Sequence, residues 1–317
     1  MSSSFTSSAA STFLGWAWVP LVLFAAMAQT VRNAAQRSLT ERAGTLGATL
    51  VRFLYGLPFA AAWVALLQAM PATTAPVAHF GAGYFVWLVT GAVGQIAATA
   101  CLLAAMKTRH FVVGVAFSKT EVLQVALFGA LFLREVPGWL VLCAMLLATA
   151  GVGLLSLPRQ AAAAGASALG WDGRSALYGL ASGACFAVSA VGYRGASLQV
   201  PELSPWLAGA WGVMWAQAVQ SLILLAWLGL HSPQVLRVVT AAWRVSLVAG
   251  LAGALASIAW FTAFAMRPAA EVRTLGLVEV LFSYLVSRRL LREELNRNEK
   301  FGLSLVLLGL VGVCLQI

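Results

Sequence analysis

The sequence predicts an all-α integral membrane protein with ten transmembrane helices, built as two inverted five-helix repeats. Of its 317 residues, 61% are hydrophobic and only 9% are charged, and the mean hydropathy is +0.87. A soluble domain usually has about 25% charged residues. Because so few charges could not cover the surface of a soluble fold, we expect lipid to surround most of the chain.

Apolar runs recur along the whole chain, and a helix needs about 20 apolar residues to cross the hydrocarbon core of a bilayer. Continuous apolar runs favour helices over a barrel, since each backbone amide must then find its hydrogen-bond partner within its own segment. We expect helices at residues 13–31, 46–68, 83–106, 111–133, 137–157, 175–193, 205–229, 243–266, 271–291 and 300–317.

A repeated charged pattern indicates an internal duplication. Glu121-Val122-Leu123 is followed by Leu133-Arg134-Glu135. Glu279-Val280-Leu281 is followed by Leu291-Arg292-Glu293 at the same spacing. Chance similarity between apolar segments does not readily bring two charged triplets into register, so we interpret the chain as two copies of one unit.

The duplication predicts a first repeat at residues 1–157, a linker at 158–174 and a second repeat at 175–317. An odd number of helices per repeat makes the second copy enter the membrane from the opposite side. Inverted repeats of this kind are typical of transporters, whose solute site lies near the midplane between the copies. Glycines also match between the copies, namely Gly91 and Gly94 with Gly250 and Gly253.

Most Lys and Arg residues, Arg32 among them, fall in the predicted loops after odd-numbered helices. By the positive-inside rule these loops are cytoplasmic and both termini lie outside. A nucleic-acid footprint would gather basic residues on one solvated face, so the net charge of +10 does not indicate nucleic-acid binding. The loops after even-numbered helices carry only Arg134, Arg194, Arg267 and Arg273.

These repeats resemble the ten-helix branch of the drug/metabolite transporter superfamily, whose unit is the EamA-type repeat. In that family the fourth helix of each repeat often contains Glu-Pro followed by a hydrophobic residue and ends in Leu-Gly-Glu. Here Val122 and Val280 stand where proline is common. The family usually has cytoplasmic termini, opposite to the charge distribution. Further matches to the family pattern are Glu121, Glu279, Glu135, Glu293, Arg52-Phe53, Gly151 and Gly312.

Ionisable residues inside predicted helices are the first candidates for a solute or ion site. A charge at the centre of a bilayer costs a few kcal/mol, so it must face protein or water and find a partner. Glu121, Glu279, Lys119 and Arg52 meet this description. They could bind solute or, for the two glutamates, carry a coupling proton. The alternative is a salt bridge buried between helices that serves only structure.

Tryptophans are the second group of candidates. Trp211 and Trp215 lie four residues apart in the predicted helix at 205–229, and Trp260 lies in that at 243–266. They could line an aromatic solute pocket. Anchoring at the membrane interface is the commoner role of tryptophan in such helices.

The sequence thus predicts a secondary transporter, a permease that exports a small metabolite, amino acid or drug-like solute by alternating access. An ion gradient, for example of protons, or the gradient of the solute would supply the energy. No nucleotide-binding G-x-x-x-x-G-K-[ST] motif is present. We expect a multi-pass protein of the bacterial cytoplasmic (inner) membrane with no cofactor or metal. Alternatives are an intramembrane enzyme acting on lipid-linked substrates and a non-transporting accessory subunit.

Overall fold

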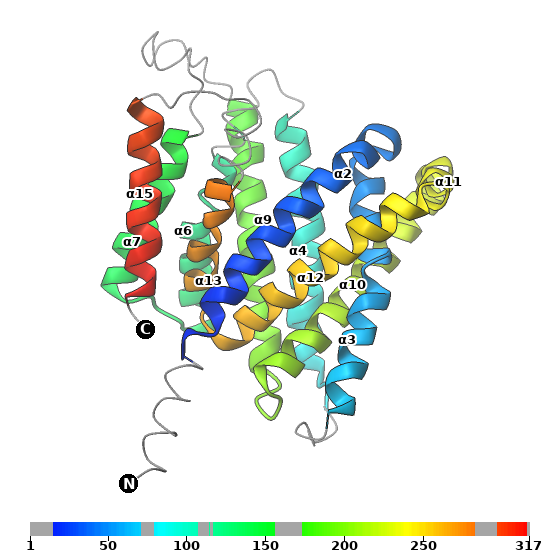
Figure 1. Ribbon diagram of the computed structural model, residues 1–317, viewed down its shortest axis with the longest axis horizontal. Coiled ribbons are helices and arrows are strands. Elements are labelled where there is room, and N and C mark those ends of the chain that lie inside the picture. The colour runs from blue at the N-terminus through cyan, green and yellow to red at the C-terminus, as the bar shows by residue number, and fades with distance from the viewer. Residues whose placement is uncertain are drawn as a thin grey trace.

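The computed structural model describes residues 15–70, 79–106, 114, 117–155, 173–282 and 297–315, and the regular elements in these ranges are all helical. Figure 1 shows them packed side by side, with α7 and α15 at one edge and α3 and α11 at the other. The first half contains α2 (Trp18–Leu54), α3 (Leu57–Ala69), α4 (Ala82–Met106), α6 (Glu121–Phe128), the π-helical segment η2 (Gly129–Leu133) and α7 (Trp139–Leu155). The second half contains α9 (Gly173–Leu198), α10 (Pro205–His231), α11 (Pro233–Ala241), α12 (Trp243–Met266), α13 (Ala269–Gly276) and α15 (Arg297–Cys314).

Among the described residues, five helical segments are long and apolar enough to cross a membrane, and two shorter apolar helices accompany them. The long segments are Leu39–Ala69, Ala82–Ala105, Gly173–Leu198, Pro205–His231 and Trp243–Met266. The shorter ones are Glu121–Leu133 and Trp139–Leu155. This composition is that of an all-helical, multi-pass membrane protein.

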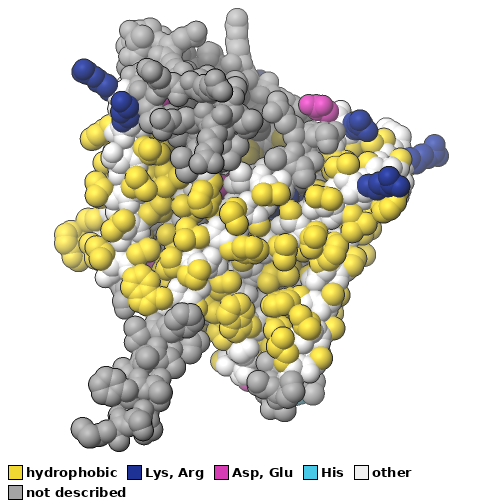
Figure 2. Space-filling view, in the orientation of Figure 1, with side chains coloured by type: hydrophobic (Ala, Val, Ile, Leu, Met, Phe, Trp, Pro, Cys, Tyr) yellow, Lys and Arg dark blue, Asp and Glu magenta, His cyan; other side chains and the backbone are white. Residues whose placement is uncertain are grey.

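The outer surface is apolar over most of its height. In Figure 2, hydrophobic side chains cover the middle of the visible face, and Lys and Arg side chains lie toward its upper end. Large apolar side chains such as Leu131, Leu222 and Leu308 are more than half exposed. A soluble monomer rarely exposes so much contiguous apolar surface, which a bilayer would cover.

The chain reverses at Gly44, inside α2 and within the stretch that was predicted as a loop between residues 31 and 46. Gly44 has φ 65° and ψ 179°, a conformation that glycine adopts at little cost. Helical structure extends on both sides of it, so the predicted end of the first helix is wrong. Arg32, assigned to that loop from the sequence, lies inside α2 and is only 6% exposed.

Two other arginines assigned to loops also lie within helices. Arg194 belongs to α9 and Arg273 to α13. Of the linker predicted at 158–174, only Gly173 and Arg174 are described, and they begin α9. The rest of that linker and the second charged triplet at 291–293 lie outside the described residues.

Helices pack with their backbones in direct contact at glycines. The most extensive helix contacts join α4 to α9, α2 to α12, and α7 to α15. A Cβ atom added at Gly192 of α9 would lie 2.8 Å from Gly91 Cα in α4. One added at Gly151 of α7 would lie 2.6 Å from the carbonyl oxygen of Gly302 in α15. Small residues permit this approach, which gives close van der Waals packing inside a membrane.

Candidate functional site

A polar cavity of about 330 Å³ lies between α2, α4, α9, α12 and α13. Its size is at the lower end of the range found for ligand pockets, about 300–1,000 Å³. Glu121, Glu279, Lys119, Arg52 and Trp260 all line it. The structure therefore brings five of the seven predicted site residues together.

Trp211 and Trp215 of α10 do not line this cavity. Their rings stack on each other with centroids 6.4 Å apart. Trp211 packs edge-on against Phe80 at 5.3 Å, and Trp215 against Phe85 at 5.6 Å. The pair belongs to an aromatic cluster near the start of α4, and its role in solute binding stays a prediction.

Glu279 is held by neutral amide groups. Gln29 Nε2 donates a hydrogen bond of 2.5 Å to one carboxylate oxygen, and Asn33 Nδ2 donates one of 3.4 Å to the other. The indole Nε1 of Trp260 donates to Gln29 Oε1 at 3.3 Å. Within the described ranges no Lys or Arg forms an ion pair with this carboxylate.

Glu121 is held in a different way, by an ion pair with Arg273. Glu121 begins α6 and its side chain is 10% exposed, while the Arg273 side chain is 24% exposed. The Arg273 guanidinium also lies over the Trp260 ring, 5.2 Å from its centroid. Sequence reasoning missed Arg273 because it was counted with the loop before the ninth helix. Its position three residues into the helix predicted at 271–291 was the signal that could have found it.

Two arginines, Arg32 and Arg52, lie next to each other on the wall of the cavity. Their aliphatic stems meet beside Gly253 of α12. A Cβ atom at Gly253 would be 3.2 Å from Arg52 Cγ and 3.4 Å from Arg32 Cδ. Arg32 Nη2 and Nε donate to Asn33 Oδ1 at 2.8 and 3.2 Å. The Arg52 guanidinium lies over the Phe53 ring, 5.0 Å from its centroid.

A hydrogen-bonded group from three helices forms another part of the cavity wall. Tyr193 Oη of α9 donates to Gln95 Oε1 of α4 at 3.1 Å. Gln220 Nε2 of α10 donates to the same Gln95 oxygen at 2.7 Å and to Tyr193 Oη at 3.0 Å. Gln220 is 1% exposed, and a buried amide of this kind needs such partners.

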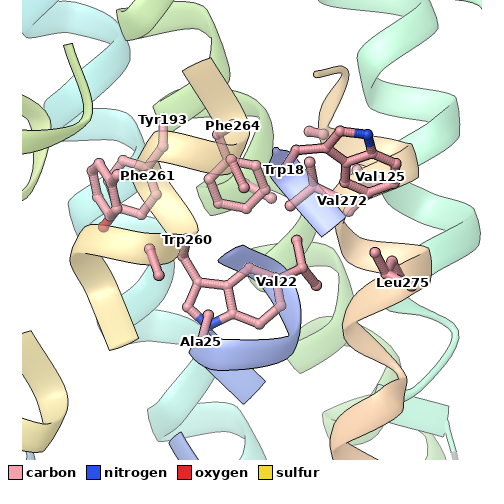
Figure 3. Close-up of a cluster of buried hydrophobic side chains, with 14 of the residues drawn as sticks. Trp18, Val22, Ala25, Val125, Tyr193, Trp260, Phe261, Phe264, Val272 and Leu275 are labelled. Carbon is pink, nitrogen blue, oxygen red and sulfur yellow. The ribbon is translucent and has the colours of Figure 1, made fainter. Parts of the chain in front are cut away.

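One end of the cavity is closed by an aromatic floor, which we define as Tyr193, Trp260, Phe261 and Phe264. Figure 3 shows these rings together, with Trp18 and Val22 from the start of α2 beside Phe264 and Trp260. All four line the cavity and are buried. The Tyr193 and Phe261 ring centroids are 4.2 Å apart.

A charged cluster lies on the side of the floor where α12 ends. Arg194 Nε and Nη2 each approach Glu135 Oε1 at 2.8 Å, and Nη1 donates to the carbonyl oxygens of Phe264 and Ala265 at 2.8 and 3.1 Å. Glu135 follows Arg134 in the sequence, but its ion-pair partner in the structure is Arg194.

The other end of the cavity lies toward α11. Thr40 and Asn33, which line it there, are exposed. Nearby, a Cβ atom at Gly47 would lie 2.7 Å from Val235 of α11. The cavity therefore narrows from a polar, accessible end near α11 to the aromatic floor.

Metal-ligating side chains are not gathered anywhere in the part of the chain that the structure describes, where no three His, Cys, Asp or Glu residues could hold one ion. The four cysteines are free thiols.

Comparison with known proteins agrees with this architecture. Residues 173–315 match the EamA-like transporter family. No curated protein matches the chain in sequence. Twenty-two solved chains match it. One of them, described only as the crystal structure of a protein, has a TM-score of 0.64 and 18% identity over 97% of this chain and 96% of its own, a likeness that shows the fold alone. The chain thus carries an EamA-like transporter family domain at residues 173–315, consistent with the drug/metabolite transporter superfamily that its sequence resembles.

Proposed function

We propose that the protein is a secondary transporter that exports a small metabolite, amino acid or drug-like solute by alternating access. The observation that carries the proposal is that Glu121 and Glu279, at equivalent positions in the two sequence repeats, line one polar cavity inside an apolar exterior. A polar chamber near the contact between two repeats is the common position of a transporter site. The match of residues 173–315 to a transporter family supports the same function.

The fold we propose is ten membrane-crossing helices in two inverted repeats. The reversal at Gly44 divides α2 into two crossings, the second of which continues into α3. In this arrangement α2 corresponds to α9, and α4 to α12. The two extensive contacts, α2 with α12 and α9 with α4, are then the same contact in each copy. Gly91 and Gly94 face α9, whereas Gly250 faces Tyr55, directly after α2, and Gly253 faces Arg52 and Arg32 of α2.

The polar end of the cavity opens, in this proposal, to the cytoplasm. Arg237 and Arg244 lie in or beside α11, at this end of the bundle, and basic residues favour the cytoplasmic side. The aromatic floor and the Arg194–Glu135 pair would then separate the cavity from the outside. Export requires the floor to open while the α11 end closes, which is the rocking movement expected of repeat-built transporters.

Glu279 is the better candidate for carrying a coupling proton. Protonation of Glu121 would break its ion pair with Arg273. Protonation of Glu279 would break no ion pair among the described residues and would change its hydrogen bonds with the neutral amides of Gln29 and Asn33. We therefore assign the proton to Glu279 and an ion-pairing role to Glu121.

Flux measurements in proteoliposomes test this function. The purified protein is assayed with a panel of amino acids, organic anions and cationic drugs, with and without a proton gradient. We expect flux of at least one solute class, and we expect Glu279→Gln to remove the effect of the proton gradient. Glu202→Gln is the matched control, because Glu202 is exposed at the end of α9. Normal gradient-driven flux in a Glu121→Gln, Glu279→Gln double variant would contradict the proposed roles of these two glutamates in transport.

The same assay separates the rival functions. An accessory subunit would give no flux of any solute when reconstituted alone. An intramembrane enzyme would convert a lipid-linked substrate, so chemical change of added lipid without solute flux would favour it.

A further inference from the structure

We propose that the solute carries an oxyanion, either a carboxylate or a phosphate group, and that Arg32 and Arg52 bind this group. The inference rests on the proposed function in taking the cavity between α2 and α12 as the solute site. It adds the chemical class of the solute and the side chains that recognise it.

The charges that line the cavity are unequal. Its lining residues include two carboxylates, Glu121 and Glu279, and four cations, namely Arg32, Arg52, Lys119 and Arg273. Arg273 is matched by Glu121, and amide groups hold Glu279. Neither Arg32 nor Arg52 forms an ion pair with a carboxylate among the described residues, although both lie within the electrostatic influence of Glu279. A chamber with this excess of positive charge favours an anion over a cation.

The two arginines have hydrogen-bond donors to spare. A guanidinium has five N–H groups in a planar fork. Asn33 Oδ1 accepts from Nε and Nη2 of Arg32, whereas the buried Arg32 Nη1 has no partner in the part of the chain described. Arg52 Nε is likewise buried without a hydrogen-bond partner there. Unsatisfied buried donors are costly, and a bound acceptor would remove that cost.

Packing against α12 also brings the positively charged side chains of Arg32 and Arg52 close to each other. Gly253 provides the space in which the stems of Arg32 and Arg52 meet, at 3.4 and 3.2 Å from where its Cβ would be. The charge of Arg52 acts on Arg32 at this distance, and an anion bound near both guanidinium groups would offset the repulsion. Carboxylate and phosphate groups suit this position because they accept paired N–H bonds from guanidinium groups.

A purely structural role would leave these donors unexplained. Stacking on Phe53 covers one face of the Arg52 guanidinium without using its N–H groups. Asn33 accepts from Arg32 alone. Water in the cavity could solvate both side chains, and a comparison of matched ligands separates this case from a binding site.

The test is thermal unfolding of the purified protein in detergent with two matched sets of probes. The carboxylate set is N-acetylphenylalanine, its neutral amide and the cationic phenylalanine amide. The phosphate set is glycerol 3-phosphate and glycerol. We expect N-acetylphenylalanine, glycerol 3-phosphate or both to raise the melting temperature, with no rise for the neutral and cationic analogues. The probe set that raises the melting temperature identifies which oxyanion the protein prefers.

Variants show whether the two arginines are responsible. Arg32→Gln and Arg52→Gln should each lower the apparent affinity for the oxyanion by about tenfold or more, because each removes charge-assisted hydrogen bonds. The affinity is measured from the ligand concentration needed to raise the melting temperature. Arg52→Lys should keep the preference for anions with a weaker response, because lysine retains the charge and loses the fork. Arg237→Gln is the matched control on the exposed surface of α11 and should behave as the unchanged protein. Melting without ligand reports whether each variant folds.

The proposal is overturned if only the cationic probe stabilises the protein, if no oxyanion does, or if the oxyanion response is equal in the Gln variants and the unchanged protein. These outcomes differ from failure of the proposed function. Flux of a cation without oxyanion binding leaves the transporter standing and removes this inference. Oxyanion binding lost in both Gln variants, without flux of any solute, keeps the anion site and removes the transporter.

Discussion

Glu121 at the start of α6 and Arg273 in α13 form an ion pair that joins the two sequence halves at the wall of the cavity. Both side chains are mostly buried, so removing one partner leaves an uncompensated charge. The pair has a structural effect that can be separated from any effect on transport.

The first prediction separates these effects with a double-mutant cycle. Glu121→Gln alone should lower the free energy of unfolding by about 3 kcal/mol, because Arg273 loses its counter-charge. Glu121→Gln combined with Arg273→Gln should recover most of this stability, since no buried charge is left unpaired. We expect flux to stay impaired in the double variant. Recovery of both stability and flux would mean that the pair serves only structure.

The second prediction concerns the two charged pairs beyond the aromatic floor. Arg194→Gln should destabilise the protein by about 3 kcal/mol, because it leaves Glu135 and two carbonyl oxygens without their donor. Arg267→Gln should cost less than about 1 kcal/mol, since the Arg267–Glu271 pair lies within one helix turn and its arginine is 29% exposed. Denaturant unfolding in mild detergent measures both values. Equal losses would contradict the difference in burial on which this prediction depends.

The third prediction concerns access to the cavity. In a background without the four native cysteines, Thr45→Cys should react with a membrane-impermeant maleimide from the same side of the membrane as Thr240→Cys. Thr45 lines the polar end of the cavity, and Thr240 is exposed in α11. Ser204→Cys, at the opposite end of α10, should react only from the other side. Right-side-out and inside-out vesicles supply the two directions of labelling.

If Thr240→Cys is labelled from the cytoplasm, the charge distribution gives the correct orientation. Labelling of Thr240→Cys from outside would instead support cytoplasmic termini. Reaction of Thr45→Cys together with Ser204→Cys would contradict a cavity that opens toward α11.

The fourth prediction concerns the reversal in α2. Gly44→Ala should destabilise the protein by about 1–2 kcal/mol, because residues with a Cβ atom disfavour positive φ. Gly153→Ala in α7 is the matched control, since a Cβ atom would meet nothing within 4 Å at either position. As an ordinary helical glycine, Gly153 should give a gain of up to about 1 kcal/mol on replacement by alanine. Similar losses in both variants would rule out the backbone conformation as the cause.

Hydropathy and register predicted much of this architecture. The apolar runs located most of the helices, because a helix that lies in lipid must consist mainly of apolar residues. The repeated triplets aligned Glu121 with Glu279, and the structure brings both to one cavity. Charge inside an apolar run selected Lys119 and Arg52 by the same reasoning. These features depend on one-dimensional spacing, which a sequence retains.

Features that depend on which way a side chain faces were not predicted. The polar stretch after residue 31 was interpreted as a loop, because polar residues facing a chamber have the same composition as polar residues facing water. Arg32 was misassigned for this reason. The spacing of Trp211 and Trp215 identified a shared helix face, but not that Phe80 and Phe85 cover it. Contacts between distant helices decide such cases.

The contacts between glycines have a consequence for any movement of this protein. The backbones approach so closely at Gly91 and Gly192 that no side chain fits between α4 and α9, and we expect the two helices to move together. The extensive contact between α2 and α12 also joins a helix of the first half to a helix of the second half. In the movement proposed above, we expect these pairs of helices to be the units that move. Either repeat produced alone would lack the backbone surface against which its longest helices are built.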